Sequence, residues 1–263
     1  LLRELDIWTS RILIMGTAGA LLLTLGFLGK KELKVPKECY RDLIIAALLN
    51  MTVFQICMTL GVHYFSAGRT VVVVYTMPLW AILFAWFILK EPIPLSRLIA
   101  LVLGLAGLAV LMSQDFSHLK DPGLGAACTV IGAISFGLGT VWMKRRTWVT
   151  DPTVVAGWQL LIGTVPLVPL WLILGTDTDW ANLSLVTLGN FIFLILIANV
   201  LAYFLWFRIL QIFPASVSGL GTLAVPIVGV IASSTLLTET FGVNELLALV
   251  LIISALAMNL KTP

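Results

Sequence analysis

Charged residues are scarce in this sequence. They make up 11% of the 263 residues, whereas ordinary soluble domains contain about 25%. Hydrophobic residues reach 60%, and the mean hydropathy is +1.06. A soluble fold of this length could not bury so much apolar surface, so the composition predicts a protein whose solvent is lipid.

Other absences exclude whole classes of function. The three cysteines, Cys39, Cys57 and Cys128, form an odd set without metal or redox spacing, which argues against a disulfide framework. There is no basic run with interleaved aromatics and no Gly-rich phosphate loop, so nucleic-acid binding is not expected. No Ser-His-Asp set, HExxH motif or paired aspartates occur, so we expect no enzyme, metal or cofactor.

The apolar residues form nine stretches, each long enough to cross a bilayer core of about 30 Å as a helix. Turn residues separate them, as in 90–94 and 120–123. An open sheet cannot span lipid, so the sequence predicts an all-α integral membrane bundle. The predicted spans are 8–28, 41–64, 70–89, 95–112, 123–143, 153–174, 185–211, 215–237 and 244–260.

Lysine and arginine gather on one side of these spans. That side holds the basic residues of 30–41, 90–97 and 144–146 together with Arg208 and Lys261, whereas the other side holds Arg3, Arg11, Arg69 and Lys120. By the positive-inside rule the basic side is cytoplasmic. We therefore expect a multi-pass protein of the cell (inner) membrane with a cytoplasmic C-terminus.

Two segments align without a gap when the chain is shifted by 148 residues. Pro78 then falls on Pro226, Glu91 on Glu239, and the run Ala100–Leu103 on Ala248–Leu251. Leucine and alanine matches are common in such a composition, but a mid-span proline and a span-end glutamate at the same spacing are not. We interpret the alignment as an internal repeat.

The repeat fixes the expected topology. The same shift pairs 8–28 with 153–174 and 41–64 with 185–211, and it pairs 123–143 with residues before Leu1. The repeat unit then has five spans, and the first span of the first unit lies outside this sequence. An odd number of spans inverts the second unit, which predicts two inverted halves: 1–112 with helices 2–5, and 113–263 with helices 6–10. Inverted repeats are typical of alternating-access transporters.

These features together resemble the EamA family of the drug/metabolite transporter superfamily. The resemblance rests on the five-plus-five inverted repeat, the mid-span prolines and the acids ending helices 4 and 9. Within the family the chain looks similar to bacterial exporters of amino acids, including aromatic ones. The resemblance implies a central cavity lined by helices 3, 4, 8 and 9, with contributions from helices 1, 2, 6 and 7.

Polar residues follow one face of helix 3, and the repeat places a second set on helix 8. A polar side chain facing lipid is costly, so these residues should face protein or water. We predict a mixed polar and aromatic solute pocket; the alternative is interhelical hydrogen bonding that only holds the bundle together. The candidate cavity residues, with aromatic walls that could instead serve packing, are Thr52, Gln55, Thr59, His63, Tyr75, Trp80, Trp158, Gln159, Asn199, Tyr203, Phe207 and Gln211.

Three further features carry role predictions. Pro78 and Pro226 are predicted hinges, with a static kink as the alternative. Glu91 and Glu239 are predicted structural acids at helix ends, each with a partner such as the cap of the next helix, and gating by a salt bridge is the alternative. Gly104 and Gly107 are predicted to allow close helix contact.

The sequence therefore predicts a secondary transporter that exports small metabolites, most of all amino acids, by alternating access. Its expected partners are an amino-acid-like solute and membrane lipid, and the working expectation is a monomer. One alternative is a carrier of organic cations, drugs or other metabolites. A second alternative is a membrane scaffold or receptor that transports nothing.

Overall fold

The computed structural model is helical throughout the part that it describes, and no strand occurs there. The described residues are 4–65, 70, 73–111, 123–176, 183–225, 228 and 243–261. The helical segments are α1 (Ile7–Leu28), η1 (Lys37–Cys39), α2 (Tyr40–Ala47), η2 (Leu48–Val53), α3 (Phe54–Phe65), α5 (Met77–Phe84), η3 (Ala85–Leu89), α6 (Leu95–Leu111), α8 (Gly123–Lys144), α9 (Pro152–Thr164), α10 (Leu167–Leu174), α11 (Leu185–Ile195), η5 (Leu196–Leu201), α12 (Ala202–Ile212), α13 (Ala215–Gly221) and α15 (Val243–Lys261).

Within the described residues, five helical stretches are long and apolar enough to cross a membrane. They are Ile7–Leu28, Lys37–Tyr64, Gly123–Lys144, Pro152–Leu174 and Leu185–Ile212. Shorter apolar helices cover Met77–Leu89, Leu95–Val110 and Leu246–Met258. These helices lie within the predicted spans to within a few residues. About half of the predicted span 215–237 lies outside the described residues.

Three predicted spans are broken by a turn among the described residues, and one of them, 215–237, turns at Thr222 and Leu223 after α13. The span 153–174 turns at Val165 and Pro166, because a proline inside a helix removes a hydrogen bond and its ring clashes with an earlier carbonyl. The span 70–89 turns at Tyr75 and Thr76, just before α5. Pro78 therefore lies in the first turn of α5, where a missing N–H costs little.

The described chain divides into two compact units. Unit 1 comprises residues 1–56 and 142–212, and unit 2 comprises residues 57–141 and 213–263. Each unit therefore takes helices from both predicted sequence halves, 1–112 and 113–263. The two halves are defined by the predicted sequence repeat. The two units are defined by which helices pack together.

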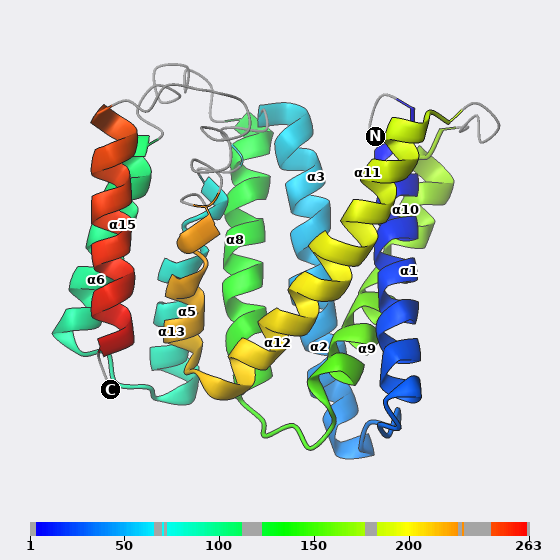
Figure 1. The fold of residues 1–263 in the computed structure, drawn as a ribbon, viewed down its shortest axis with the longest axis horizontal. Coiled ribbons are helices and arrows are strands. Elements are labelled where there is room, and N and C mark those ends of the chain that lie inside the picture. Colours follow the sequence, from blue (N-terminus) through cyan, green and yellow to red (C-terminus); the bar gives the residue numbers. More distant parts are fainter. Residues whose placement is uncertain are drawn as a thin grey trace. The chain divides into compact units, whose positions relative to one another are not determined.

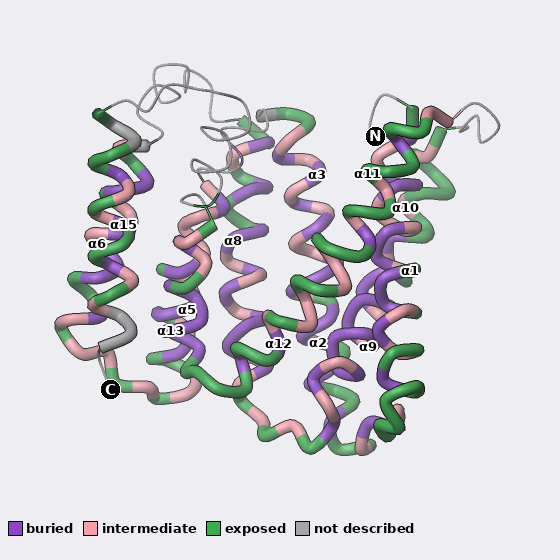
Figure 2. Tube along the Cα trace, in the orientation of Figure 1, coloured by how far each residue is buried: buried purple, intermediate pink, exposed green. Residues whose placement is uncertain are grey.

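Unit 1 is built around the contact of α1 with α9. A Cβ on Gly19 would lie 3.0 Å from the carbonyl oxygen of Gly157, and one on Gly26 would lie 3.0 Å from Val154. Because higher positions on α1 meet lower positions on α9, the two helices run in opposite directions (Figure 1). Glycine at these sites lets the backbones approach closely. Figure 2 shows many buried positions along α9.

Unit 2 has an equivalent contact between α6 and α15. A Cβ on Gly107 would lie 3.1 Å from the carbonyl oxygen of Ala248, and one on Gly104 would lie 3.6 Å from Ala255. This pairing is again antiparallel (Figure 1). The prediction that Gly104 and Gly107 allow close helix contact is confirmed.

Aspartate side chains cap the starts of α1 and α9 in unit 1. The Thr9 amide donates to Asp6 Oδ2 at the start of α1, and the Thr153 amide donates to Asp151 Oδ1 at the start of α9, both at 2.9 Å. Such caps satisfy amides that have no partner inside the helix.

Candidate functional site

In helix 3 the first two predicted cavity residues belong to unit 1 and are buried. Thr52 Oγ1 donates to the carbonyl oxygen of Gly163 on α9 at 2.8 Å. Gln55 is also buried, one helical turn later. The Thr52 contact agrees with the alternative reading of the stripe, because it joins two helices.

The last two residues of that stripe belong to unit 2 and differ from each other. Thr59 is buried, and its Oγ1 has no hydrogen-bond partner among the described residues. His63 is exposed, with its ring edge-on to Tyr64 at a centroid distance of 4.7 Å. The polar stripe of helix 3 is therefore buried as far as Thr59 and exposed at His63.

The aromatic residues predicted on helix 4 also lie in unit 2. Tyr75 is half-buried in the turn before α5, and Trp80 is half-buried in the first turns of α5. Gly137 of α8 packs against Trp80, since a Cβ there would lie 2.8 Å from Trp80 Cβ. Trp80 Nε1 is enclosed and has no partner within the described ranges.

Two predicted residues of α9 are engaged inside unit 1. Gln159 is fully buried and donates from Nε2 to Met143 Sδ at 2.7 Å, while its Oε1 has no partner in the part of the chain that the structure describes. Trp158 is half-buried and donates from Nε1 to the carbonyl oxygen of Leu33 at 2.9 Å. That bond ties α9 to the loop after α1.

The predicted residues of helix 8 are spread along η5 and α12. Asn199 Nδ2 donates to the carbonyl oxygen of Leu194 at 2.8 Å. Tyr203 is half-buried against the core of unit 1, Phe207 is buried and Gln211 is exposed. Only Phe207 and Gln211 of the twelve candidates line a common described cavity.

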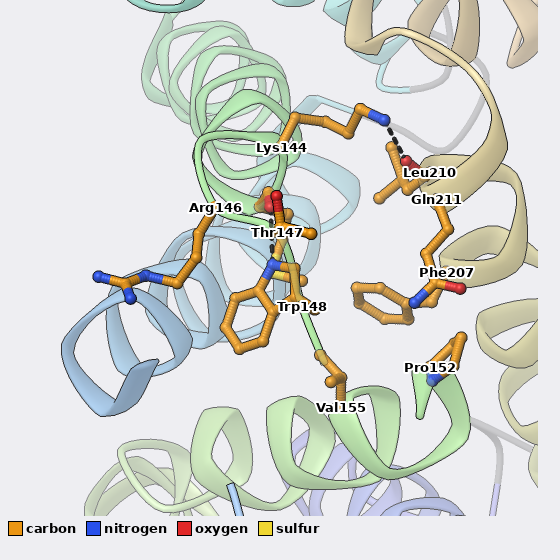
Figure 3. A pocket seen from close by; sticks show the side chains of 10 residues that line it. Lys144, Arg146, Thr147, Trp148, Pro152, Val155, Phe207, Leu210 and Gln211 are labelled. Carbon is orange, nitrogen blue, oxygen red and sulfur yellow. Dashed lines mark hydrogen bonds between the residues drawn. The ribbon is translucent and has the colours of Figure 1, made fainter. Parts of the chain in front are cut away.

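That cavity lies within unit 1, between the loop after α8, the start of α9 and the end of α12 (Figure 3). Its volume is about 340 Å³, within the range of small-molecule sites. The residues around it are Met143, Lys144, Arg146, Thr147, Trp148, Pro152, Val155, Phe207, Leu210 and Gln211. We call it the loop pocket.

Two hydrogen bonds fix the walls of the loop pocket. Lys144 Nζ donates to the carbonyl oxygen of Leu210 at 2.6 Å, and Trp148 Nε1 donates to the carbonyl oxygen of Met143 at 2.7 Å (Figure 3). The Trp148 and Phe207 rings stand on facing sides, and Gln211 lies beside Phe207. A lysine ammonium has three N–H donors, so one ammonium can bond to a carbonyl and to an anionic group together.

Arg146 points away from the loop pocket and anchors the loop instead (Figure 3). Its Nε donates to Asp42 Oδ2 at 2.7 Å, and Trp142 Nε1 donates to Asp42 Oδ1 at 3.1 Å. The hydrogen bond to Asp42 raises the pKa of Arg146 above its ordinary value. This anchor holds the pocket wall to the start of α2.

The other end of the loop is held by Asp151. Lys31 Nζ lies 3.3 Å from Asp151 Oδ2. Burial acts to raise the pKa of Asp151, but hydrogen bonds from Thr153 and Lys31 outweigh it, so the pKa is lowered. The carboxylate therefore stays charged and keeps its contacts at neutral pH.

Sequence reasoning did not propose Lys144, Thr147 and Trp148 as site residues. Lys144 enters the sequence prediction only as part of the basic side, and Trp148 lies beyond the end of the predicted span 123–143. The available signal was the run Lys144–Trp148, which combines basic, hydroxyl and aromatic residues between two spans. Chain folding brings this run to α12, and no spacing in the sequence encodes that approach.

Glu91 has the partner that was predicted for it, although on a different helix. The Ala215 amide donates to Glu91 Oε1 at 3.3 Å and Ser216 Oγ donates to Oε2 at 2.8 Å, so Glu91 caps α13 rather than the next helix. The buried Arg97 donates from Nη1 to Ser216 Oγ at 3.0 Å. A carboxylate at a helix N-terminus is favourable. Glu239 lies outside the described residues.

We expect Glu91→Ala to lower the free energy of unfolding by about 2 kcal/mol, because α13 loses its cap and the buried Arg97 loses a nearby negative charge. Thermal unfolding of the detergent-purified protein measures this change. Glu32→Ala, which removes an exposed acid, is the control. An unchanged melting temperature together with impaired transport would instead favour gating.

Of the two predicted hinge prolines, the structure describes Pro78. Pro78 is buried in the first turn of α5, after a turn in which Thr76 Oγ1 donates to the carbonyl oxygen of Val73 at 2.7 Å. A similar turn ends α13, where Thr222 Oγ1 donates to the carbonyl oxygen of Gly219 at 2.7 Å. Pro226 lies outside the described residues, and the hinge role stays a prediction.

Among the described residues no group of three or more His, Cys, Asp or Glu side chains could hold a metal ion. Cys39, Cys57 and Cys128 all lie in the described part and are free and buried.

Comparison with known proteins agrees with the membrane fold. The EamA-like transporter family model matches residues 1–113 and 123–261. The uncharacterized transporter YoaV of Bacillus subtilis is 26% identical over 239 residues, which cover 90% of this chain and 81% of YoaV. The probable amino-acid metabolite efflux pump of Escherichia coli is 25% identical over 200 residues, covering 73% and 67%. One solved crystal structure has a TM-score of 0.81 at 16% identity over 97% of this chain and 88% of that chain, a likeness of fold.

Proposed function

Because this chain belongs to the EamA-like transporter family, and is thus a multi-pass integral membrane protein of the drug/metabolite transporter superfamily, we propose that it exports small zwitterionic metabolites. Amino acids, the aromatic ones in particular, are the proposed solutes. The observation that carries this proposal is the loop pocket, where a lysine ammonium and two facing rings line one cavity.

The chemistry of the loop pocket suits an aromatic amino acid. The Lys144 ammonium would bind the carboxylate through a charge-assisted hydrogen bond, and the Gln211 amide and Thr147 hydroxyl would add weaker ones. The rings of Phe207 and Trp148 would take the solute's side chain by stacking or edge contact. By the positive-inside rule this loop faces the cytoplasm, the side from which an exporter loads.

Transport by alternating access is supported by the arrangement of repeat-related helices. In the predicted repeat, α1 corresponds to α9, and α6 corresponds to α15; each pair packs together and runs antiparallel. The two ranges matched by the family model also fall close to the two predicted halves. Both observations favour two inverted five-helix halves that rock against each other.

The remaining predicted residues enter this proposal as lining groups of the solute path. Within unit 1 these are Thr52, Gln55, Trp158, Gln159 and Tyr203, and within unit 2 they are Thr59, His63, Tyr75 and Trp80. Asn199 is excepted, because its amide bonds to the Leu194 carbonyl. Buried polar groups in an apolar bundle are costly, which favours a function for those without a protein partner.

The proposal is tested with purified protein in liposomes that contain unlabelled solute, by counterflow of radiolabelled solutes. We expect phenylalanine to accumulate in these liposomes and not in protein-free ones. Phenethylamine, which has the same ring and no carboxylate, should accumulate far less. The reverse order would favour the organic-cation alternative, and no accumulation of any amino acid would refute the proposal.

A further inference from the structure

Two π-helical segments occupy equivalent places in the predicted repeat. They are η2 (Leu48–Val53) and η5 (Leu196–Leu201), and their first residues are 148 positions apart, the spacing that aligns Pro78 with Pro226. π-helix accounts for well under 1% of residues in proteins and occurs frequently at functional sites. Neither segment contains a proline or glycine that would explain a distorted turn.

Each π segment carries one asparagine, and the two are used differently. Asn199 Nδ2 donates to the carbonyl oxygen of Leu194, five residues earlier, and so satisfies a backbone acceptor near the distorted turn. Asn50 has only 1% of its surface exposed, yet neither its Nδ2 nor its Oδ1 meets a hydrogen-bond partner in the described ranges. The predicted repeat therefore contains one amide that bonds to the backbone, Asn199, and one uncommitted amide, Asn50, meaning one without a hydrogen-bond partner among the described residues.

The surroundings of Asn50 within unit 1 are tightly packed. The neighbouring Met51 lies against Gly163 of α9, and Thr52 Oγ1 donates to the carbonyl oxygen of Gly163. One turn earlier on α9, Gln159 is fully buried with an unpartnered Oε1, as far as the described residues go. Two segments that pack on each other thus carry three uncommitted polar atoms.

Such atoms are exceptional. More than about nine in ten buried polar groups have a hydrogen-bond partner, because leaving one without a partner in a low-dielectric interior is unfavourable. An asparagine that only stabilised the bundle would bond to a neighbouring helix, as Thr52 does, or to its own helix, as Asn199 does. Neither holds for Asn50.

We propose that Asn50 is a solute-binding and specificity-determining residue of the transporter, whereas Asn199 is structural. The inference rests on the proposed function and deepens it. A primary amide both donates and accepts, so it recognises a group that offers both, such as the ammonium and carboxylate of an amino acid or a carboxamide. Gln159 Oε1 supplies a second acceptor on the adjoining helix.

The test compares Asn50→Leu with the matched variant Asn199→Leu. Leucine has the same number and branching of side-chain heavy atoms as asparagine, and replacing a buried amide that has no partner by an apolar group is neutral or stabilising. We expect Asn50→Leu to keep or raise the melting temperature and to weaken apparent solute affinity about tenfold or more. We expect Asn199→Leu to lower the melting temperature, since the Leu194 carbonyl loses its partner, with affinity near that of the wild type.

Counterflow by the wild type is measured first. A failure of the proposed function and a failure of the role of Asn50 then give different results. If the wild type moves no solute, the proposed function is wrong. If the wild type transports and Asn50→Leu transports with unchanged affinity, the role of Asn50 is wrong, and its amide holds only water. Asn50→Ala serves as the second variant, and loss of folding in both Asn50 variants would make this residue structural and overturn the inference.

Discussion

Lys144→Met should lower phenylalanine transport about 30-fold at solute concentrations below KM, mainly by raising KM. The methionine side chain keeps most of the length and apolar surface of lysine and removes its charge. A hydrogen bond that involves a charged group contributes about 1.5–3 kcal/mol, which corresponds to tenfold to more than a hundredfold in affinity. The loss should exceed that of any other single substitution in the loop pocket, since Lys144 carries the positive charge nearest the proposed carboxylate position.

The matched control is Arg145→Met, which removes the same charge from the next position. Arg145 is exposed, its guanidinium lies over the Trp142 ring, and it does not line the loop pocket. A general effect of surface charge on orientation or solute attraction should affect both variants equally. If Arg145→Met impairs transport as much as Lys144→Met does, the ammonium has no specific role.

A second control uses the same Lys144→Met variant with a different solute. Phenylalanine methyl ester lacks the carboxylate that Lys144 is proposed to bind. Its transport should be equally slow in the wild type and in Lys144→Met. A further drop with the ester would show that the substitution acts through the fold, because Lys144 also donates to Leu210 at the end of α12.

Gly163→Ala should destabilise unit 1 by about 3 kcal/mol. A Cβ at this position would overlap the side chain of Met51 and lie 3.2 Å from the carbonyl oxygen of Ala47. Neither atom is the free end of a flexible chain, so α9 and η2 must move apart. The Thr52 hydrogen bond to the Gly163 carbonyl would weaken at the same time.

Gly189→Ala provides the comparison for this substitution. Gly189 is exposed on α11, and a Cβ there would meet no atom within 4 Å. Alanine is favoured over glycine in a helix by up to about 1 kcal/mol, so this variant should be neutral or more stable. Thermal unfolding of both variants in the same detergent decides the matter, and equal melting temperatures would contradict the tight α9–η2 contact.

The span positions followed from the sequence because lipid imposes a simple requirement. Every backbone polar group must be satisfied within its own helix, so about 20 apolar residues with turn chemistry on both sides suffice for a prediction. The ends of α1, α6 and α8 agree with the predicted 8–28, 95–112 and 123–143 to within one residue. Close packing at Gly107 was equally predictable, because a missing side chain leaves room that only another helix can fill.

The turn at Val165 was also accessible from the sequence, because Pro166 is visible there, although the span was predicted to be continuous. The π segments were not accessible. Leu48–Val53 and Leu196–Leu201 contain ordinary helix-compatible residues, and a π turn depends on the contacts around it rather than on propensity. The uncommitted amide of Asn50 is invisible in the sequence for the same reason.

By itself, the sequence determined that the chain is a membrane-embedded helical bundle and where most of its apolar helices lie, and it predicts which segments repeat. These properties are local, since hydropathy and turn chemistry act within one span. Only the tertiary structure decided that the repeat-related helices α1 and α9 pack together in one unit and α6 and α15 in the other. It alone brought Lys144 to Gln211 and left Asn50 without a partner among the described residues, because such meetings depend on side-chain packing between segments far apart in the chain.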